Sequence, residues 1–316
     1  MTKSQAKRVI SRVLFSLMLT ITASAINGAP FTIDNVLSKL SGNFDKVSRV
    51  KDQLPGNVSA FEDQIYSQNL HLDIYQPKGT GLFPAVLIVH GGGWETGHRY
   101  MERPFAKQLA GFGFVTVPVS YRLGKAGQFP AALHDLKSAV RWLRANAQRW
   151  QIDPNRIAVV GGSAGGHLAA LLGASNGVAD FEGQGVHQEQ VSTVQAVVNI
   201  DGAASFPDAR LIAQEKQKPN ATSRFLQGNY SEQRTAWFAA SPLYYVGPNS
   251  APTLFINSTA PTPILPGREA MSARLQALGI HSTIVVIPNT PHPFWLVHPW
   301  FTKTLSETVR FLQQHL

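Results

Sequence analysis

Runs of apolar residues recur along this chain and alternate with segments whose apolar residues have helical spacing. The segment NLHLDIYQP (69–77) alternates apolar and polar positions, which predicts a strand with one face in water. Other runs are almost continuously apolar, which is typical of strands buried on both faces. These runs are FPAVLIVH (83–90), GFVTVPVSY (113–121), RIAVVGG (156–162), VQAVVNID (194–201), APTLFIN (251–257) and HSTIVVIP (281–288).

Helical patterns lie between the predicted strands. In FPAALHDLKSAVRWLRANA (129–147), the residues Leu133, Leu136, Val140 and Leu143 share one helix face. The segment REAMSARLQALG (268–279) ends in a glycine that suits a helix C-terminus, and residues 300–316 predict an amphipathic helix. Strands that alternate with helices predict an α/β fold with a doubly wound, mostly parallel sheet.

Two stretches lack this alternation. Residues 26–57 are turn-rich with weak periodicity, and we interpret them as a loosely packed N-terminal lead-in to a main domain at 58–316. Residues 203–250 contain no clear buried strand but several aromatic residues. We expect a small cap-like insertion here, after the sixth strand and over the carboxyl edge of the sheet, where ligands bind in such folds. A pair of connecting helices with core aromatics is the alternative.

The segment RIAVVGGSAGGHLAALL (156–172) predicts a buried strand, a tight turn and a helix. Its turn contains Gly161, Ser163 and Gly165, which form the Gly-x-Ser-x-Gly pattern of a nucleophile elbow. The helix N-terminus places partial positive charge where an oxyanion would form. A phosphate-binding or structural glycine loop is the alternative, but the strand before and the helix after favour Ser163 as a nucleophile.

A second glycine-rich turn, HGGGW (90–94), follows a buried strand. Glycines at this place leave backbone N–H groups accessible to an oxyanion beside the nucleophile. We assign the oxyanion hole to the N–H groups of Gly92, Gly93 and Ala164. We expect His90 to support the loop, whereas Trp94 either lines the site or packs in the core.

The candidate base follows the last predicted strand. The chain order in serine hydrolases with this elbow is serine, acid, histidine. His292 lies on a proline-rich loop five residues beyond Ile287, and we favour it over His298, which precedes Pro299 near the final helix. The other histidines show no metal-binding spacing.

The motifs HGGGW, YRL, DPNRIAVVGGSAGGHLAAL and SPLYYV resemble α/β-hydrolase esterases of the acetyl xylan and feruloyl esterase (BD-FAE-like) type. They are also similar to the wider hormone-sensitive-lipase-like carboxylesterases. The resemblance extends from about residue 60 onward, and the tail resembles esterases associated with pectin breakdown. It implies the α/β-hydrolase fold and a serine hydrolase of acetyl or methyl esters in plant cell-wall polysaccharide, with a general short-chain esterase or a non-catalytic binding protein as alternatives.

The acid of the triad departs from this family pattern. Relatives carry an Asp in a His-Gly-x-x-Asp stretch after the penultimate strand, where this chain reads NSTAPTP, with Pro261 or Thr262 near the expected position. Asp201, at the end of the preceding strand, and Glu269, at the start of a helix, are the two substitutes. We prefer Asp201, because the end of a strand positions a side chain more rigidly than the far end of a proline loop.

The N-terminus predicts a secretory signal peptide. Lys3, Lys7, Arg8 and Arg12 precede the apolar run VLFSLMLTITASA, and cleavage is expected after Ala25. An uncleaved membrane anchor is the alternative. Removal of these four charges leaves 24 basic and 19 acidic residues, a net charge of +5 instead of +9.

The net charge and the residue composition limit the classes of binding partner and cofactor. A charge of this size without a basic aromatic stripe does not indicate nucleic-acid binding. The chain has no Cys, which excludes disulfides and thiolate chemistry. We expect a secreted or periplasmic enzyme that needs neither a metal nor an organic cofactor and has no membrane span after processing. Its oligomeric state stays open.

Overall fold

The computed structural model describes residues 31–44, 46–259 and 266–316. The predicted signal peptide at 1–25 and the positions Pro261 and Thr262 lie outside the described residues. Within the described part, none of the helices has the length and apolar character needed to cross a membrane.

A mostly parallel sheet of eight strands forms the centre of the domain. Its strands follow the spatial order β2-β3-β5-β4-β6-β7-β8-β9, and β2 and β3 pair in antiparallel fashion while β5, β4, β6, β7, β8 and β9 run parallel. This arrangement confirms the α/β prediction. The strands are β2 Val58–Ser67, β3 Leu70–Pro77, β4 Phe83–Val89, β5 Val115–Val119, β6 Ile152–Gly162, β7 Ala196–Ile200, β8 Thr253–Asn257 and β9 Ser282–Val286.

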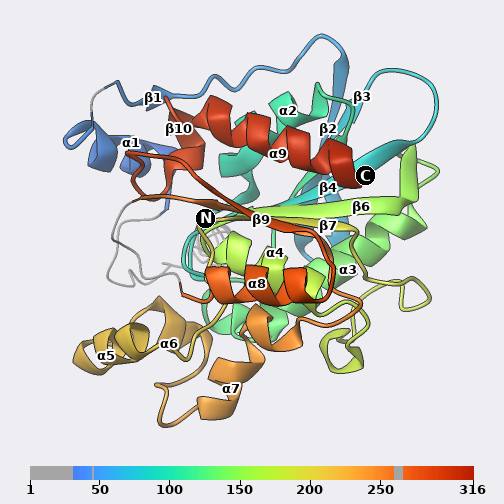
Figure 1. Cartoon of the computed structure of the whole chain (residues 1–316). Coiled ribbons are helices and arrows are strands. Elements are labelled where there is room, and N and C mark those ends of the chain that lie inside the picture. Colours follow the sequence, from blue (N-terminus) through green and yellow to red (C-terminus); the bar gives the residue numbers. More distant parts are fainter. Residues whose placement is uncertain (1–30, 45, 260–265) are drawn as a thin grey trace, which may run out of the picture. The chain divides into compact units, whose positions relative to one another are not determined.

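Helices cover both faces of the sheet. In Figure 1, α2 and α9 lie on one side of the strands, and α3, α4 and α8 lie on the other. The α-helices are α1 Ile33–Ser41, α2 Arg103–Ala110, α3 Ala131–Ala145, α4 Ala164–Ala174, α5 Ala209–Gln217, α6 Ala221–Phe225, α7 Arg234–Ala239, α8 Arg268–Ala277 and α9 Phe301–His315. Short 3-10 helices are η1 Arg99–Glu102, η2 Gly124–Gly127, η3 Ala179–Phe181, η4 Pro242–Tyr245 and η5 Phe294–Leu296.

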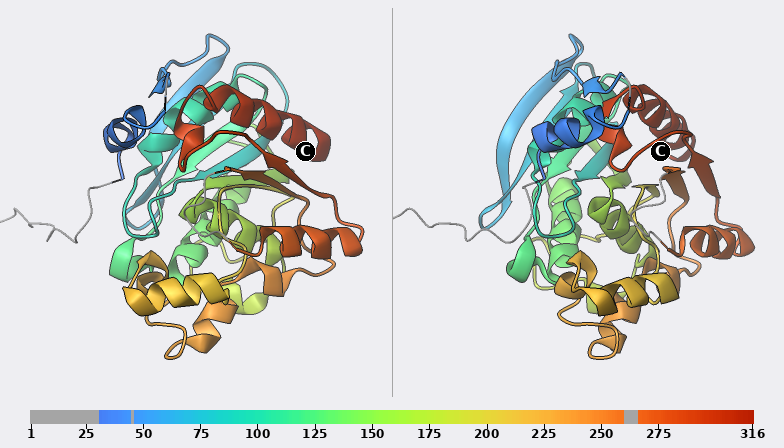
Figure 2. Two further views of the ribbon diagram at one scale, coloured as in Figure 1. Left: turned by 60° about the vertical axis from the view of Figure 1, so that its left-hand side comes forward. Right: turned by 90° about the vertical axis from the view of Figure 1, so that its left-hand side faces the viewer.

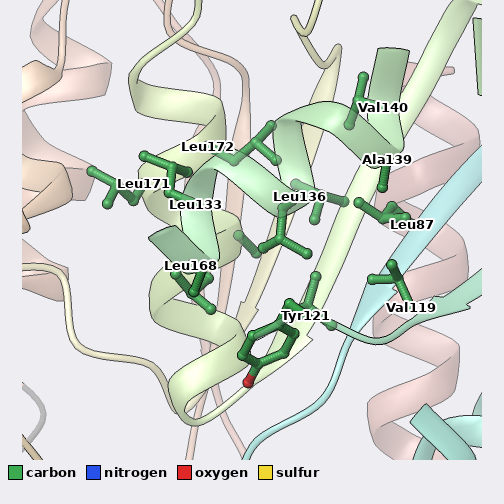
Figure 3. Packing of buried hydrophobic residues seen from close by; sticks show 14 of the residues in the cluster. Leu87, Val119, Tyr121, Leu133, Leu136, Ala139, Val140, Leu168, Leu171 and Leu172 are labelled. Atoms are coloured by element: carbon green, nitrogen blue, oxygen red, sulfur yellow. The ribbon is translucent and has the colours of Figure 1, made fainter. Parts of the chain in front are cut away.

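Alternate residues of β4 belong to different hydrophobic cores. Leu87 and Val89 pack with residues of α3 and α4 on one face, whereas Val86 and Ile88 pack with α2 and α9 on the other. Figure 3 shows the first of these cores, in which Leu133 and Leu136 of α3 meet Leu168 of α4. Burial on both faces explains why this strand reads as a continuous apolar run.

The segment between β7 and β8 contains α5, α6, α7 and η4, which lie together at one end of the domain in both views of Figure 2. It follows the sixth strand of the large sheet in chain order. The aromatic residues Phe206, Phe225 and Trp237 are buried there, so they serve as core residues of this segment.

Three elements, α1, β1 and β2, were not predicted from the sequence. The lead-in contains α1 and the short strand β1 (Ser48–Arg49), which pairs with β10 (Val297–His298). Val36, Leu40 and Val50 are buried, so the expectation of loose packing was wrong. Strand β2 has a register irregularity and a largely exposed middle, and this removes the alternation by which an edge strand is recognised.

Candidate active site

Ser163 lies in the tight turn between β6 and α4. Its backbone adopts φ 56° and ψ −120°, a conformation that costs free energy for any residue other than glycine. The Ser163 N–H donates to the carbonyl of Ile200 at 2.8 Å, which ties the turn to the end of the neighbouring strand β7. A Cβ atom on Gly161 would lie 2.2 Å from the Gly165 oxygen, so the turn closes only with glycine there.

His292 follows β9 and reaches the serine. Its Nε2 lies 2.9 Å from Ser163 Oγ, within hydrogen-bond distance. His298 lies elsewhere: it pairs with Ser48 in the two-stranded β1–β10 sheet and its ring packs against Phe301. The structure therefore brings His292, and not its competitor, to the serine.

Asp201 completes a chain of hydrogen bonds. Its Oδ2 lies 3.0 Å from Nδ1 of His292, which leaves Nε2 of the same ring to face Ser163. Glu269, the alternative acid, is exposed in the first turn of α8, where it complements the helix dipole. Because β6, β7, β8 and β9 are adjacent and parallel, the segments that follow them meet at one edge of the sheet.

The loop after β7 keeps the Asp201 carboxylate available. The hydrogen bond that closes this turn is made by Asn199 and not by Asp201: Oδ1 of Asn199 accepts from the Gly202 N–H at 2.7 Å. Asp201 is fully buried, and its Oδ1 accepts from the Ser258 N–H at 2.8 Å. Burial alone raises the pKa of Asp201, but its contacts with His292 and Ser258 outweigh that effect and hold the pKa below its usual value.

The glycine loop after β4 lies beside the nucleophile. A Cβ atom on Gly91 would lie 3.2 Å from Cβ of Ser163. Gly92 and Gly93 have φ of 116° and 62°, and their N–H groups donate to no acceptor within the described residues. Ala164 opens α4, so its N–H has no partner inside the helix. The three N–H groups are therefore available to donate hydrogen bonds to an oxyanion, as an oxyanion hole requires.

Two residues of this loop pack in the core. His90 is buried, its Nδ1 lies 2.7 Å from the Gly91 carbonyl, and its ring stacks on Tyr121. Burial lowers the pKa of His90 to about 4, so the ring is neutral and supports the loop as expected. Trp94 is also buried, and its Nε1 donates to Nδ1 of His167 at 3.2 Å. Trp94 therefore packs in the hydrophobic core.

The segment between β7 and β8 contacts the same loop. Trp94 stacks on Phe225 of α6 with ring centroids 4.7 Å apart, and a Cβ atom on Gly93 would lie 3.2 Å from Ala221. Nε2 of His167, on α4, lies 2.7 Å from the Ala240 carbonyl. His167 therefore connects the glycine loop to the end of α7, a role that its position in the sequence did not reveal.

Three further contacts of the site were missed. Ser258 and Arg268 donate to Asp201, and Trp295 packs edge-on against the His292 ring at 5.3 Å. The sequence carries no signal for them, because a serine, an arginine and a tryptophan near predicted loops are common. Across the described residues, no group of three or more His, Asp or Glu side chains is arranged to hold a metal ion.

Comparisons with known proteins agree with this architecture. The chain shares 29% identity over 230 residues with the esterase LipQ of Mycobacterium tuberculosis, covering 72% of this chain and 54% of LipQ. It shares 32% identity over 232 residues with an AB hydrolase superfamily protein of Schizosaccharomyces pombe, covering 70% and 67% of the two chains. The match thus spans little more than half the length of the mycobacterial relative.

Solved structures have the same fold. A bifunctional GH43-CE protein of Bacteroides eggerthii matches with a TM-score of 0.71 and 26% identity, over 81% of this chain and 38% of that one. Thermogutta terrifontis esterase 2, phosphonylated by sarin, matches with a TM-score of 0.68 and 25% identity, over 83% and 96%. The sheet order, the strained serine turn and these neighbours define an α/β-hydrolase fold. The BD-FAE family model matches residues 72–271, more than half of the chain, and the chain belongs to this family.

Proposed function

We propose that the protein is a serine carboxylesterase in which Ser163, His292 and Asp201 form the catalytic triad. The single observation that carries the proposal is the hydrogen-bonded chain from Ser163 Oγ to His292 Nε2, 2.9 Å, and from His292 Nδ1 to Asp201 Oδ2, 3.0 Å. The related proteins with esterase names support the same class of reaction.

The reaction has two halves. Ser163 Oγ attacks the ester carbonyl carbon while His292 Nε2 accepts its proton, and the oxyanion forms near the amides of Gly92, Gly93 and Ala164. The intermediate then expels the alcohol, which takes the proton from His292 and leaves an acyl-enzyme. A water molecule, deprotonated by His292, attacks the acyl group, and collapse of that intermediate frees the acid and restores Ser163. Asp201 orients the ring and stabilises the imidazolium in both halves.

The test is the variant Ser163→Ala with p-nitrophenyl acetate. We expect kcat to fall by several orders of magnitude, about 10⁴-fold or more. A fluorophosphonate probe should label the wild-type protein at Ser163 and leave the variant unlabelled. Unchanged turnover in the variant contradicts the nucleophile assignment, and a wild-type protein that neither turns over nor reacts is a binding protein on a hydrolase fold.

For the substrate, we propose acetyl or methyl esters of plant cell-wall polysaccharide. The resemblance of the tail to pectin-associated esterases supports this, as does the likeness to the GH43-CE protein. A general short-chain esterase is the second candidate, and the likeness to Thermogutta esterase 2 favours it. Acetate and methanol release from acetylated pectin, methylated pectin and acetylated xylan, beside p-nitrophenyl acetate, separates the two: a general esterase hydrolyses only the small ester efficiently.

We propose further that the protein is exported to the periplasm or the medium. The basic start, the apolar run and the Ala-x-Ala sequence before residue 26 support export. N-terminal sequencing of the protein recovered from the periplasm or medium should begin at Ile26. Recovery of the intact leader in the membrane fraction contradicts the proposal.

A further inference from the structure

The carboxylate of Asp201 uses its two oxygens differently. Oδ2 faces Nδ1 of His292 at 3.0 Å, whereas Oδ1 accepts from the Ser258 N–H at 2.8 Å and from Nη1 of Arg268 at 3.1 Å. The side chain of Asp201 is fully buried, and that of Arg268 is only 14% exposed. A guanidinium thus lies directly behind the acid that contacts His292.

The backbone fixes Arg268 in this place. Arg268 opens α8, and the preceding Gly267 has φ 86°, in the region that favours glycine. A Cβ atom on Gly267 would lie 2.5 Å from Cβ of Ser205, and the Pro266 carbonyl accepts from the Ala204 N–H at 2.8 Å. The segment after Asp201 and the start of α8 are therefore bound to each other, which sets the distance between carboxylate and guanidinium.

Charge explains why a cation here matters. Removing two charged groups from water costs free energy, which their mutual attraction offsets. If one partner is lost, the other remains as an uncompensated buried charge. Within the described residues Asp201 is the one carboxylate that pairs with Arg268, and the Nε of Arg268 has no partner. The guanidinium holds Oδ1, so that Oδ2 stays directed at His292, and it places a positive charge beside the buried carboxylate.

We propose that Arg268 is a positioning residue of the triad: it orients Asp201, and its charge sets the lowest pH at which the enzyme works. The inference rests on the proposed esterase function. The charged or titratable groups that face His292 among the described residues are Ser163, Asp201 with Arg268 behind it, and Glu102 beyond the indole of Trp295. Glu102 is unchanged in the Arg268 and Arg274 variants described next.

The test compares Arg268→Met with Arg268→Lys. In the methionine variant, kcat should fall about tenfold or more, the effect of losing a hydrogen bond to a charged group, while KM stays near the wild-type value because Arg268 is behind the acid. The acid limb of the kcat/KM profile reports protonation of the general base. Removal of a nearby cation makes that protonation easier, so the limb should move to higher pH. Arg268→Lys keeps the positive charge, so its acid limb should lie at the wild-type pH and its kcat should be higher than that of Arg268→Met.

Arg274→Met is the matched control. Arg274 lies on the same helix, is exposed, and donates to the Leu243 carbonyl, so the loss of its charge should leave the profile unchanged. A methionine variant of Arg268 with the wild-type profile, or with a lower kcat and an unmoved acid limb, overturns the inference and leaves only a structural contact. If Arg268→Met does not fold, Arg268→Lys decides: a shifted limb despite the retained charge contradicts the proposal.

The two proposals fail in different ways. If wild-type protein shows no turnover of p-nitrophenyl acetate and no fluorophosphonate labelling of Ser163, the proposed function fails. If the wild type is active and Arg268→Met keeps its pH profile, only the role of Arg268 fails.

Discussion

Arg224 on α6 binds both carboxylate oxygens of Glu95, which lies one residue beyond Trp94 in the glycine loop; Nη2 and Oε2 are 2.7 Å apart. The bidentate pair joins the segment between β7 and β8 to the loop that holds two of the three candidate oxyanion donors. Together with the stacking of Trp94 on Phe225, it makes α6 a fixed support of this loop.

Loss of this ion pair should affect catalysis more than stability. Arg224 is 45% exposed, so Arg224→Gln should change the free energy of unfolding by less than about 1 kcal/mol. A small displacement of the oxyanion donors should nevertheless lower kcat roughly tenfold. Arg210→Gln, which breaks an exposed ion pair with Asp208 on α5, is the control and should retain wild-type kcat. Equal kcat in both variants would show that α6 does not support the loop.

Two substitutions of a carboxylate by its amide can show which residue is the acid of the triad. Asp201→Asn should lower kcat by about 10⁴-fold, because an asparagine neither holds the required tautomer of His292 nor stabilises the imidazolium. Glu269→Gln should keep the wild-type rate, since Glu269 is exposed on α8. Steady-state rates with p-nitrophenyl acetate measure both effects. The reverse pattern would make Glu269 the acid.

Gly162 should tolerate no side chain. A Cβ atom there would lie 2.3 Å from the indole carbons of Trp295, the ring that packs against His292. Gly162→Ala should therefore destabilise the protein by about 1–3 kcal/mol and lower kcat as the indole moves. Urea unfolding and steady-state kinetics measure the two effects. Gly56→Ala meets no atom within 4 Å and should behave as wild type; a similar loss in both variants would exclude the indole contact as the cause.

The buried Glu102 should make stability depend on pH. Burial raises the pKa of Glu102 from 4.5 to about 7, with the Trp295 Nε1 contact acting in the opposite direction. Between these values the unfolded chain has lost its proton while the folded chain keeps it, so stability falls as pH rises. Glu102→Gln removes this term, and its stability relative to wild type should rise by roughly 3 kcal/mol from pH 4.5 to pH 7. A difference that is constant across this range, measured by urea unfolding, contradicts the prediction.

The sequence by itself determined the parts of the protein that neighbouring residues encode. A buried strand, a glycine-flanked serine and a helix follow one another without interruption, so the serine turn needs no information from elsewhere. The same holds for the apolar strands of the sheet and for HGGGW, whose glycines are required by the local backbone. The helix α1 was missed although Ile33, Val36, Leu37 and Leu40 recur at helical spacing, because the run covers only nine residues and its burial depends on distant partners.

Only the tertiary structure shows which candidate acid contacts His292 and which candidate histidine reaches Ser163. In the sequence, Asp201 and Glu269 are both plausible acids. Only the strand order, with β7 and β9 on either side of β8, brings Asp201 to within 3.0 Å of His292. Arg268 was invisible for the same reason: it is next to Glu269 in the chain, yet its side chain meets a carboxylate 67 residues away. Contacts across a sheet edge depend on strand order, which no local pattern of residues contains.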